Sequence, residues 1–429
     1  MIKFIYKYFF YIVLITLIVN LLTIFGCYCF GDQNGSIEKY NFSKSLHLLS
    51  FISISTISII FIYLNRNKKP IYWTCLINMF LFLTLVATAE FYFLFTESKK
   101  NGLVYLDDLE FRLLRPEPYK NSNYFSHEFI YGQYWPAKRP TFFKPSQTNI
   151  LVPNDFEGKW LNIIDNKRLT TNAPKNHFQN IYVFGGSTLY SVEVPDSLTI
   201  CSILQRLINN SGKKMKVHNY GVPAATVPQQ IERLKKYVEI QFGDIVIFYD
   251  GANDISSGVY YGKEFGGIPG FNLPPTSQQN LLIKIKKYSA AGRYFYKKSV
   301  KKYQPFLNKS ESVSIKYCDN LRRINKYVSE QGGVFFHFLQ PHIYTKSSLN
   351  LYEQKIIYER DKEAHPNMDF AFKKTMPMIE NCLSDFVFSK NLTRCFDELD
   401  YSPFIDACHV TEVGNKVIAK NIFEVINEF

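Results

Sequence analysis

The 429-residue sequence lacks the patterns that hold most metals, phosphates and dinucleotides. It has no paired C-x-x-C and no H-x-x-x-H pair with a nearby carboxylate, which are common zinc-binding spacings. It also has no phosphate-binding loop and no dinucleotide fingerprint. We therefore expect no cofactor and no metal ion. Internal repeats and low-complexity tracts are absent as well, which excludes a repeat array.

Long blocks of like charge are also absent, although the formal net charge is +13. A basic balance can indicate a nucleic-acid partner or an anionic membrane surface. Here the lysines are scattered along the chain, which is typical of a solvated surface with some attraction to lipid headgroups. We expect no nucleic-acid partner.

Apolar and aromatic residues, by contrast, are abundant at 46% and 17%, and the excess lies in the first hundred residues. Three apolar runs, at residues 8–30, 46–64 and 71–95, each approach the roughly 20 residues that cross a bilayer as a helix. The first run is too long for a signal peptide, and no small-x-small cleavage site follows it. Residues 1–100 are therefore expected to form a membrane anchor with three transmembrane helices.

The basic residues in short loops predict the orientation of this anchor. Lys3 and Lys7 precede the first run, and the stretch "NRNKK" at residues 65–69 separates the second run from the third. This bias places the N-terminus and that loop in the cytoplasm, so the rest of the chain would lie outside it. Lys99 and Lys100 favour the opposite orientation more weakly.

Two regions follow the expected anchor. Residues 101–178 are polar and contain several prolines, so we expect a lead-in segment that packs on the next domain, with short extended pieces at residues 149–153 and 159–164. From residue 179 strands and helices alternate. Strands are expected at residues 181–184, 214–219, 244–249 and 334–339, and helices at residues 197–210, 228–240, 312–330, 350–364, 370–383 and 413–425. The continuously apolar strands predict a parallel sheet covered on both faces, hence an α/β sandwich.

The first of these strands ends abruptly in "GGS", which presents Ser187 at its carboxyl end. Ligand sites of α/β sheets lie at that edge. A serine becomes a nucleophile only when a base takes its proton, an acid orients the base and donors await the oxyanion. The alternative is a plain structural turn.

Asp406 and His409 can supply the acid and the base. Their spacing of three residues brings both side chains to one face of a helical turn. The alternative is a surface pair that caps the following helix. Thr411 can cap that helix by itself, so this alternative leaves the pair unexplained.

Two residues at other strand ends can supply the oxyanion donors. Gly221 follows the second strand, and its bare backbone allows an N–H group to approach closely. Asn253 follows the third strand within "GAND". Taken alone, each is more simply a turn residue.

Taken together, the blocks "FGGST", "NYG", "GAND" and "DACH" resemble those of the SGNH hydrolases, also called GDSL-like hydrolases. The resemblance runs from about residue 181 to the C-terminus and is greatest to membrane-linked bacterial members. It implies a three-layer α/β/α, flavodoxin-like sandwich at residues 179–429 and a triad of Ser187, His409 and Asp406. It also implies an oxyanion hole made by Ser187 N–H, Gly221 N–H and Asn253.

One position departs from the family pattern. Gly186 stands where the family's named motif has aspartate, but no triad or oxyanion role falls there, so catalysis is expected to survive. An α/β-hydrolase elbow, G-x-S-x-G, is the rival assignment for Ser187, but its last glycine is missing here. Ser191 is a competing nucleophile that lies further into the loop.

These features together predict a serine esterase in a bacterial inner membrane, multi-pass, with its catalytic domain in the periplasm. The expected substrate is an O-acyl ester, such as an O-acetyl ester, on a cell-envelope or exported glycan. That substrate follows from the resemblance and the location, not from any residue. Two alternatives remain: an O-acyltransferase that needs a partner protein, and a non-catalytic glycan-binding module. The oligomeric state stays open.

Three further features are left open by the sequence. Residues 256–307 form an insertion whose basic half is either a solvated surface helix or an amphipathic helix that touches the membrane or an anionic glycan. Gln340 and His342 follow the last strand and are candidates to line the pocket, although His342 is not expected to act as a second base. Cys382 and Cys395 bracket a polar loop, and a disulfide between them is as compatible with the sequence as two free thiols.

Overall fold

The computed structural model describes residues 150–263, 304–354 and 367–428, together with residue 365 and short stretches between residues 117 and 148. The three expected membrane spans, most of the insertion and most of the expected helix at residues 350–364 lie outside this part of the chain. Among the described residues, no helix combines the length and the hydropathy needed to cross a membrane.

A seven-stranded sheet forms the centre of the fold, in the order β3-β4-β6-β5-β7-β8-β9. Five neighbouring strands are parallel: β5 (Gln179–Gly185), β6 (Met215–Gly221), β7 (Ile245–Asp250), β8 (Val334–Leu339) and β9 (Ser389–Asn391). The four strands expected from the apolar runs are confirmed. If these five strands are numbered by their order in the chain, their order across the sheet is 2-1-3-4-5. The switch point of this arrangement lies between β5 and β7. A crevice is therefore expected outside the carboxyl ends of these two strands.

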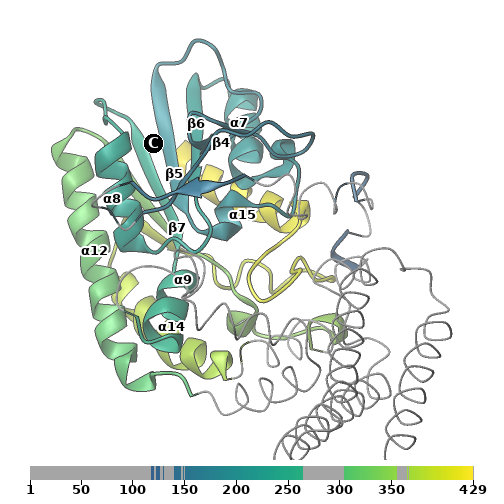
Figure 1. The fold of residues 1–429 in the computed structure, drawn as a ribbon, viewed down its shortest axis with the longest axis vertical. Coiled ribbons are helices and arrows are strands. Elements are labelled where there is room, and N and C mark those ends of the chain that lie inside the picture. The colour runs from purple at the N-terminus through teal and green to yellow at the C-terminus, as the bar shows by residue number, and fades with distance from the viewer. Residues whose placement is uncertain are drawn as a thin grey trace, which may run out of the picture. The chain divides into compact units, whose positions relative to one another are not determined.

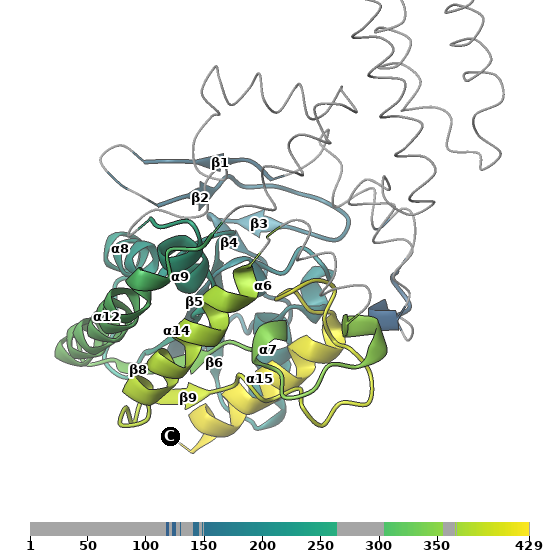
Figure 2. The same ribbon diagram turned by 90° about the horizontal axis from the view of Figure 1, so that it is seen from below.

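Helices cover both faces of the sheet, which gives the three layers (Figures 1 and 2). One face carries α7 (Ile200–Asn210) and α15 (Glu412–Asn427), and the other carries α8 (Val227–Tyr237), α12 (Ser310–Glu330) and α14 (Met368–Leu383). Val183 and Ile247 point into the first core, whereas their neighbours Phe184 and Phe248 point into the second. Because both faces are buried, most positions of β5, β7 and β8 are apolar, whereas β6 also carries Lys216, His218 and Asn219.

The lead-in segment adds a hairpin to one edge of the sheet. Strands β3 (Ile163–Ile164) and β4 (Lys167–Arg168) are antiparallel, and β4 pairs with β6 through Arg168 and Asn219. The two turn residues, Asp165 and Asn166, have φ values of 50° and 60°, the left-handed conformation that a tight hairpin turn requires. A separate pair, β1 (Phe142–Phe143) and β2 (Val152–Pro153), lies within the same segment.

The cysteine pairing differs from the one considered from the sequence. Cys382 on α14 forms a disulfide with Cys318 on α12, with the two Cα atoms 6.6 Å apart, and Cys395 is a free thiol. The suggested Cys382–Cys395 bridge is therefore wrong. The reason is that α12 and α14 pack side by side on one face of the sheet, which brings Cys318 opposite Cys382.

Candidate active site

Ser187 begins a single helical turn, α6 (Ser187–Tyr190), directly after β5. The two glycines before it let neighbouring chain segments come close. A β-carbon on Gly185 would lie 2.9 Å from the carbonyl oxygen of Tyr249, and one on Gly186 would lie 2.2 Å from Nδ2 of Asn253. The first N–H groups of a helix have no partner within it. The Ser187 N–H makes no hydrogen bond to another described residue.

His409 connects Ser187 to Asp406. The Nε2 atom of His409 lies 2.8 Å from Oγ of Ser187, and its Nδ1 atom lies 2.7 Å from Oδ2 of Asp406. The three residues expected to form the triad are therefore in contact in the structure. Ser187 and His409 meet although they lie 222 positions apart in the sequence. This chain of contacts is the arrangement in which an imidazole can take the serine proton while a carboxylate holds the imidazole in place.

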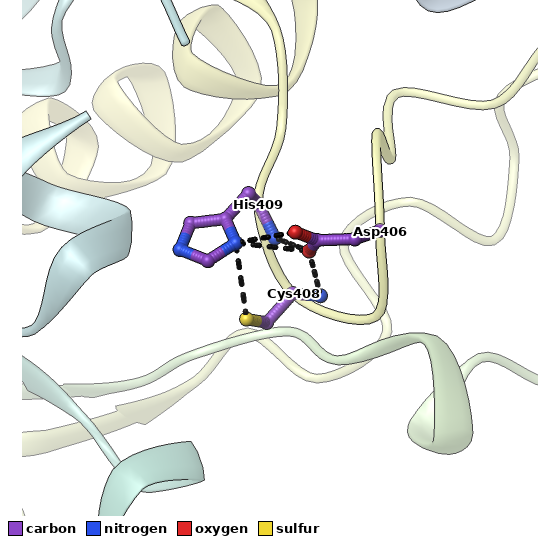
Figure 3. A group of neighbouring side chains, drawn as sticks. All are labelled: Asp406, Cys408 and His409. Atoms are coloured by element: carbon purple, nitrogen blue, oxygen red, sulfur yellow. Dashed lines mark hydrogen bonds and ion pairs between the residues drawn. The ribbon is translucent and has the colours of Figure 1, made fainter. Parts of the chain in front are cut away.

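The loop before α15 positions the acid and the base (Figure 3). The Asp406 carboxylate accepts hydrogen bonds from the backbone N–H groups of Cys408, at 3.0 Å, and His409, at 2.8 Å. The two side chains therefore meet across a side-chain-stabilised bend, not along the helical turn expected from their spacing. The same carboxylate orients the backbone and the imidazole, so both depend on one residue.

The charges around His409 favour its protonated form. Burial alone would lower the pKa of the imidazole. The negative charges of Asp406 and Glu193, the neighbouring Cys408 and the hydrogen bond to Asp406 outweigh burial and raise the pKa of His409 well above 6.5. A base with a raised pKa accepts a proton strongly but must first be deprotonated to act.

Asn253 lies beside the serine, in the short helix α9 (Ala252–Ile255) that follows β7. Its Nδ2 atom donates a hydrogen bond to the carbonyl oxygen of Ala225 at 2.9 Å. A carboxamide has two N–H groups, so the second is left for another acceptor. The preceding Gly251 has a φ of 124°, a conformation that favours glycine, and a β-carbon there would lie 2.6 Å from Leu339.

Gly221 has a packing role that the sequence did not reveal. A β-carbon at this position would lie 2.5 Å from the backbone nitrogen of Tyr190, so only glycine lets β6 approach α6. Its N–H donates to Oδ1 of Asn219 at 2.9 Å. The Gly221 N–H is therefore occupied in this structure, and the donor role implied by the resemblance would require the Asn219 carboxamide to move away.

The other candidates near the site are buried. Ser191 is 1% exposed, and its hydroxyl accepts a hydrogen bond from Asn415, so it does not compete with Ser187. His342 is 4% exposed and stacks on Phe372, and burial lowers its pKa to about 3. It remains neutral at physiological pH, although Asp406 and His409 are close enough for their charges to affect its pKa. Gln340 is buried as well.

A buried arginine that sequence analysis missed fixes the chain after the serine helix. Arg168 donates from Nε to Oδ1 of Asp196 at 2.7 Å, from Nη1 to the carbonyl oxygens of Tyr190 and Ser191, and from Nη2 to that of Val194. Its side chain has no exposed surface. No sequence signal distinguishes this arginine from the scattered surface charges, because its partners lie 22 to 28 positions away.

The sequence matches no protein-family model and no curated protein. Similar solved structures do exist. One is a member of the lipolytic G-D-S-L family from Veillonella parvula, at 14% identity and a TM-score of 0.35, with 59% of this chain and 100% of that chain covered. A lipase/acylhydrolase from Enterococcus faecalis has 14% identity and a TM-score of 0.34, with 58% and 96% covered.

An acetylxylan esterase from Geobacillus stearothermophilus is also similar, at 14% identity and a TM-score of 0.32, with 58% of this chain and 95% of that chain covered. The similar structures are esterases and lipases by description. Scores this low assign neither family nor activity, so a function for this chain must be argued from its own residues.

Proposed function

We propose that the chain is a membrane-anchored serine esterase of the SGNH type. The observation that carries this proposal is the continuous contact from Ser187 Oγ through His409 to the Asp406 carboxylate. The position of Ser187 supports it, because the serine follows β5 at the switch point of the sheet, where such folds bind ligands.

The reaction would proceed through an acyl-enzyme. Ser187 Oγ attacks the ester carbonyl carbon while Nε2 of His409 takes the hydroxyl proton. The tetrahedral oxyanion would accept hydrogen bonds from the Ser187 N–H and from Nδ2 of Asn253. His409 then gives its proton to the departing alkoxide, which leaves as the alcohol. Water, activated by His409, next attacks the acyl-serine and releases the acid.

The substrate that we propose is an O-acyl ester, most simply an acetyl ester, on a cell-envelope or exported glycan. The support comes from the sequence: three apolar runs that would anchor the chain and a charge bias that would place the domain outside the cytoplasm. An acyltransferase would use the same acyl-serine but pass the acyl group to a sugar hydroxyl instead of water.

Esterase activity of the full-length protein in detergent on p-nitrophenyl acetate tests this proposal. We expect measurable turnover that Ser187→Ala abolishes. The matched control is Ser191→Ala, which removes a nearby buried hydroxyl that is hydrogen-bonded to Asn415 and should leave turnover intact. Equal activity in the native protein and Ser187→Ala would refute the assignment of the nucleophile. Activity that appears only with an added sugar acceptor would favour the transferase.

A further inference from the structure

A third side chain with metal-binding chemistry lies against the pair of His409 and Asp406. The Sγ atom of Cys408 is 3.7 Å from Nδ1 of His409 (Figure 3). The ligand atoms of Asp406, Cys408 and His409 all lie within 4.8 Å of one another. The proposed ester hydrolysis does not use this thiol. Thiolate, imidazole and carboxylate are the three donor types that bind zinc in proteins.

The distance between the thiol and the imidazole is close to that between two ligands of one zinc ion. A thiolate at about 2.3 Å and an imidazole nitrogen at about 2.0–2.1 Å from a tetrahedral zinc lie about 3.6 Å apart. The observed separation between Cys408 Sγ and His409 Nδ1, 3.7 Å, agrees with this value. The carboxylate is too close, at 2.7 Å from Nδ1. Because about 3.4 Å is needed for two ligands of this kind, the Asp406 side chain must draw back.

The cluster is open enough for an ion to enter. The side chains of Asp406 and His409 are 20% and 21% exposed, and Cys408 is half-buried. A water molecule from this open side can complete four-coordination, as it does in zinc sites with three protein ligands. The negative charge of Asp406 would draw a cation to the same place.

We propose that Asp406, Cys408 and His409 form an inhibitory zinc site, in which Zn²⁺ replaces the proton on Nδ1 of His409. Starting from the imidazolium, coordination releases this proton and the thiol proton of Cys408 to solvent. The imidazole keeps its other proton on Nε2. The Nε2 atom then donates to Ser187 Oγ and can no longer accept the serine proton. The inhibition rests on the proposed esterase function, whereas metal binding does not.

Cobalt(II) is the probe for the site, because a thiolate bound to Co²⁺ gives a charge-transfer band in the near ultraviolet. Full-length protein in detergent is titrated with Co²⁺ beside Cys408→Ser and Cys395→Ser. Cys395 is the matched control, since among the described residues it is the other half-buried cysteine outside the disulfide. We expect the band in the native protein and in Cys395→Ser but not in Cys408→Ser. A native protein without the band, or a band that survives in Cys408→Ser, would overturn the site.

Inhibition by Zn²⁺ is then measured in the esterase assay. We expect Cys408→Ser to raise the zinc concentration for half-inhibition at least about 10-fold, because loss of even an outer partner of a metal site weakens binding this much. Cys395→Ser should leave it unchanged, and EDTA should restore activity. Equal inhibition of both variants would refute the inhibitory role. If the cobalt band depends on Cys408 but the native protein has no esterase activity, the metal site stands and the proposed esterase function is refuted.

Discussion

Asn253 lies so close to Gly186 that a β-carbon on residue 186 would be 2.2 Å from the Nδ2 atom of the carboxamide. Gly186 is the position where the resembling family has aspartate, and the sequence alone indicates no triad or oxyanion role for it. The structure indicates that this glycine leaves room for the Asn253 carboxamide to lie beside Ser187. The identity of residue 186 and the placement of an oxyanion donor are therefore linked in this chain.

Replacing Gly186 with alanine should lower activity more than stability. The backbone there has a φ of −82°, which any residue adopts, and the clash falls on a side chain that can rotate away. If Asn253 is a donor, Gly186→Ala should lower kcat about 10²–10³-fold, the usual effect of losing one oxyanion-hole donor. Steady-state kinetics and a thermal melt measure the two effects.

A double-mutant cycle shows whether the two positions act together. Asn253→Ala alone should cause a similar loss, and the double variant should lose little more than either single variant, because both remove the same interaction. If the fold-loss in kcat of the double variant equals the product of the two single losses, Gly186 acts independently of Asn253.

Activity should rise with pH through the pKa of His409. Only the deprotonated imidazole can accept the serine proton, and the surrounding negative charges raise its pKa well above 6.5. The plot of kcat/KM against pH, which reports groups of the free enzyme, should therefore have its acid-side midpoint above 6.5. Asp406→Asn removes a charge that raises this pKa. We expect the midpoint to move to lower pH, while kcat falls on the order of 10⁴-fold because the imidazole is no longer held in the correct tautomer.

NMR titration of the His409 ring provides an independent readout of the same pKa in Ser187→Ala, where no turnover is needed. A midpoint at or below 6.5 in this titration would contradict the electrostatic account. A midpoint that does not respond to Asp406→Asn would show that another charge, such as that of Glu193, dominates.

The sequence was sufficient for the strands that position Ser187, Gly221 and Asn253. The strands before Ser187 and Asn253 contain continuous apolar runs, whereas β6, before Gly221, also includes Lys216, His218 and Asn219. Strand β9 was missed, since it is only the three polar residues "SKN" at the sheet edge. The sequence also could not show that Asn219 occupies the Gly221 N–H, because this depends on a side-chain rotamer. Contacts that depend on how distant segments pack, such as those of Arg168, leave no periodic pattern in the chain.

Arg168 should be essential for stability. Its guanidinium binds Asp196 and three carbonyl oxygens of the segment that follows the serine helix, with no exposed surface. Arg168→Met would leave the Asp196 carboxylate without its buried cation, so we expect a loss of about 3–5 kcal/mol in the free energy of unfolding. Arg168→Lys should rescue little, because an ammonium group cannot reproduce the planar set of donors.

Urea unfolding followed by tryptophan fluorescence measures the effect of these substitutions. The control is Arg322→Met, which removes an ion pair with Asp319 between two exposed side chains and should cost less than about 1 kcal/mol. An Arg168→Met protein as stable as this control would show that the buried network contributes no net stability.

The disulfide between Cys318 and Cys382 links fold stability to cellular location. It closes a loop of 64 residues, and the chain-entropy relation gives about 4 kcal/mol of stabilisation for a loop of this length. Disulfides persist in the periplasm but are rare in the cytosol. If the domain faces the periplasm, as proposed, alkylation of the protein directly in cells should find both thiols protected, and Cys395→Ser should not change this. Both thiols free in cells, with normal esterase activity, would place the domain on the cytoplasmic side and contradict the predicted orientation.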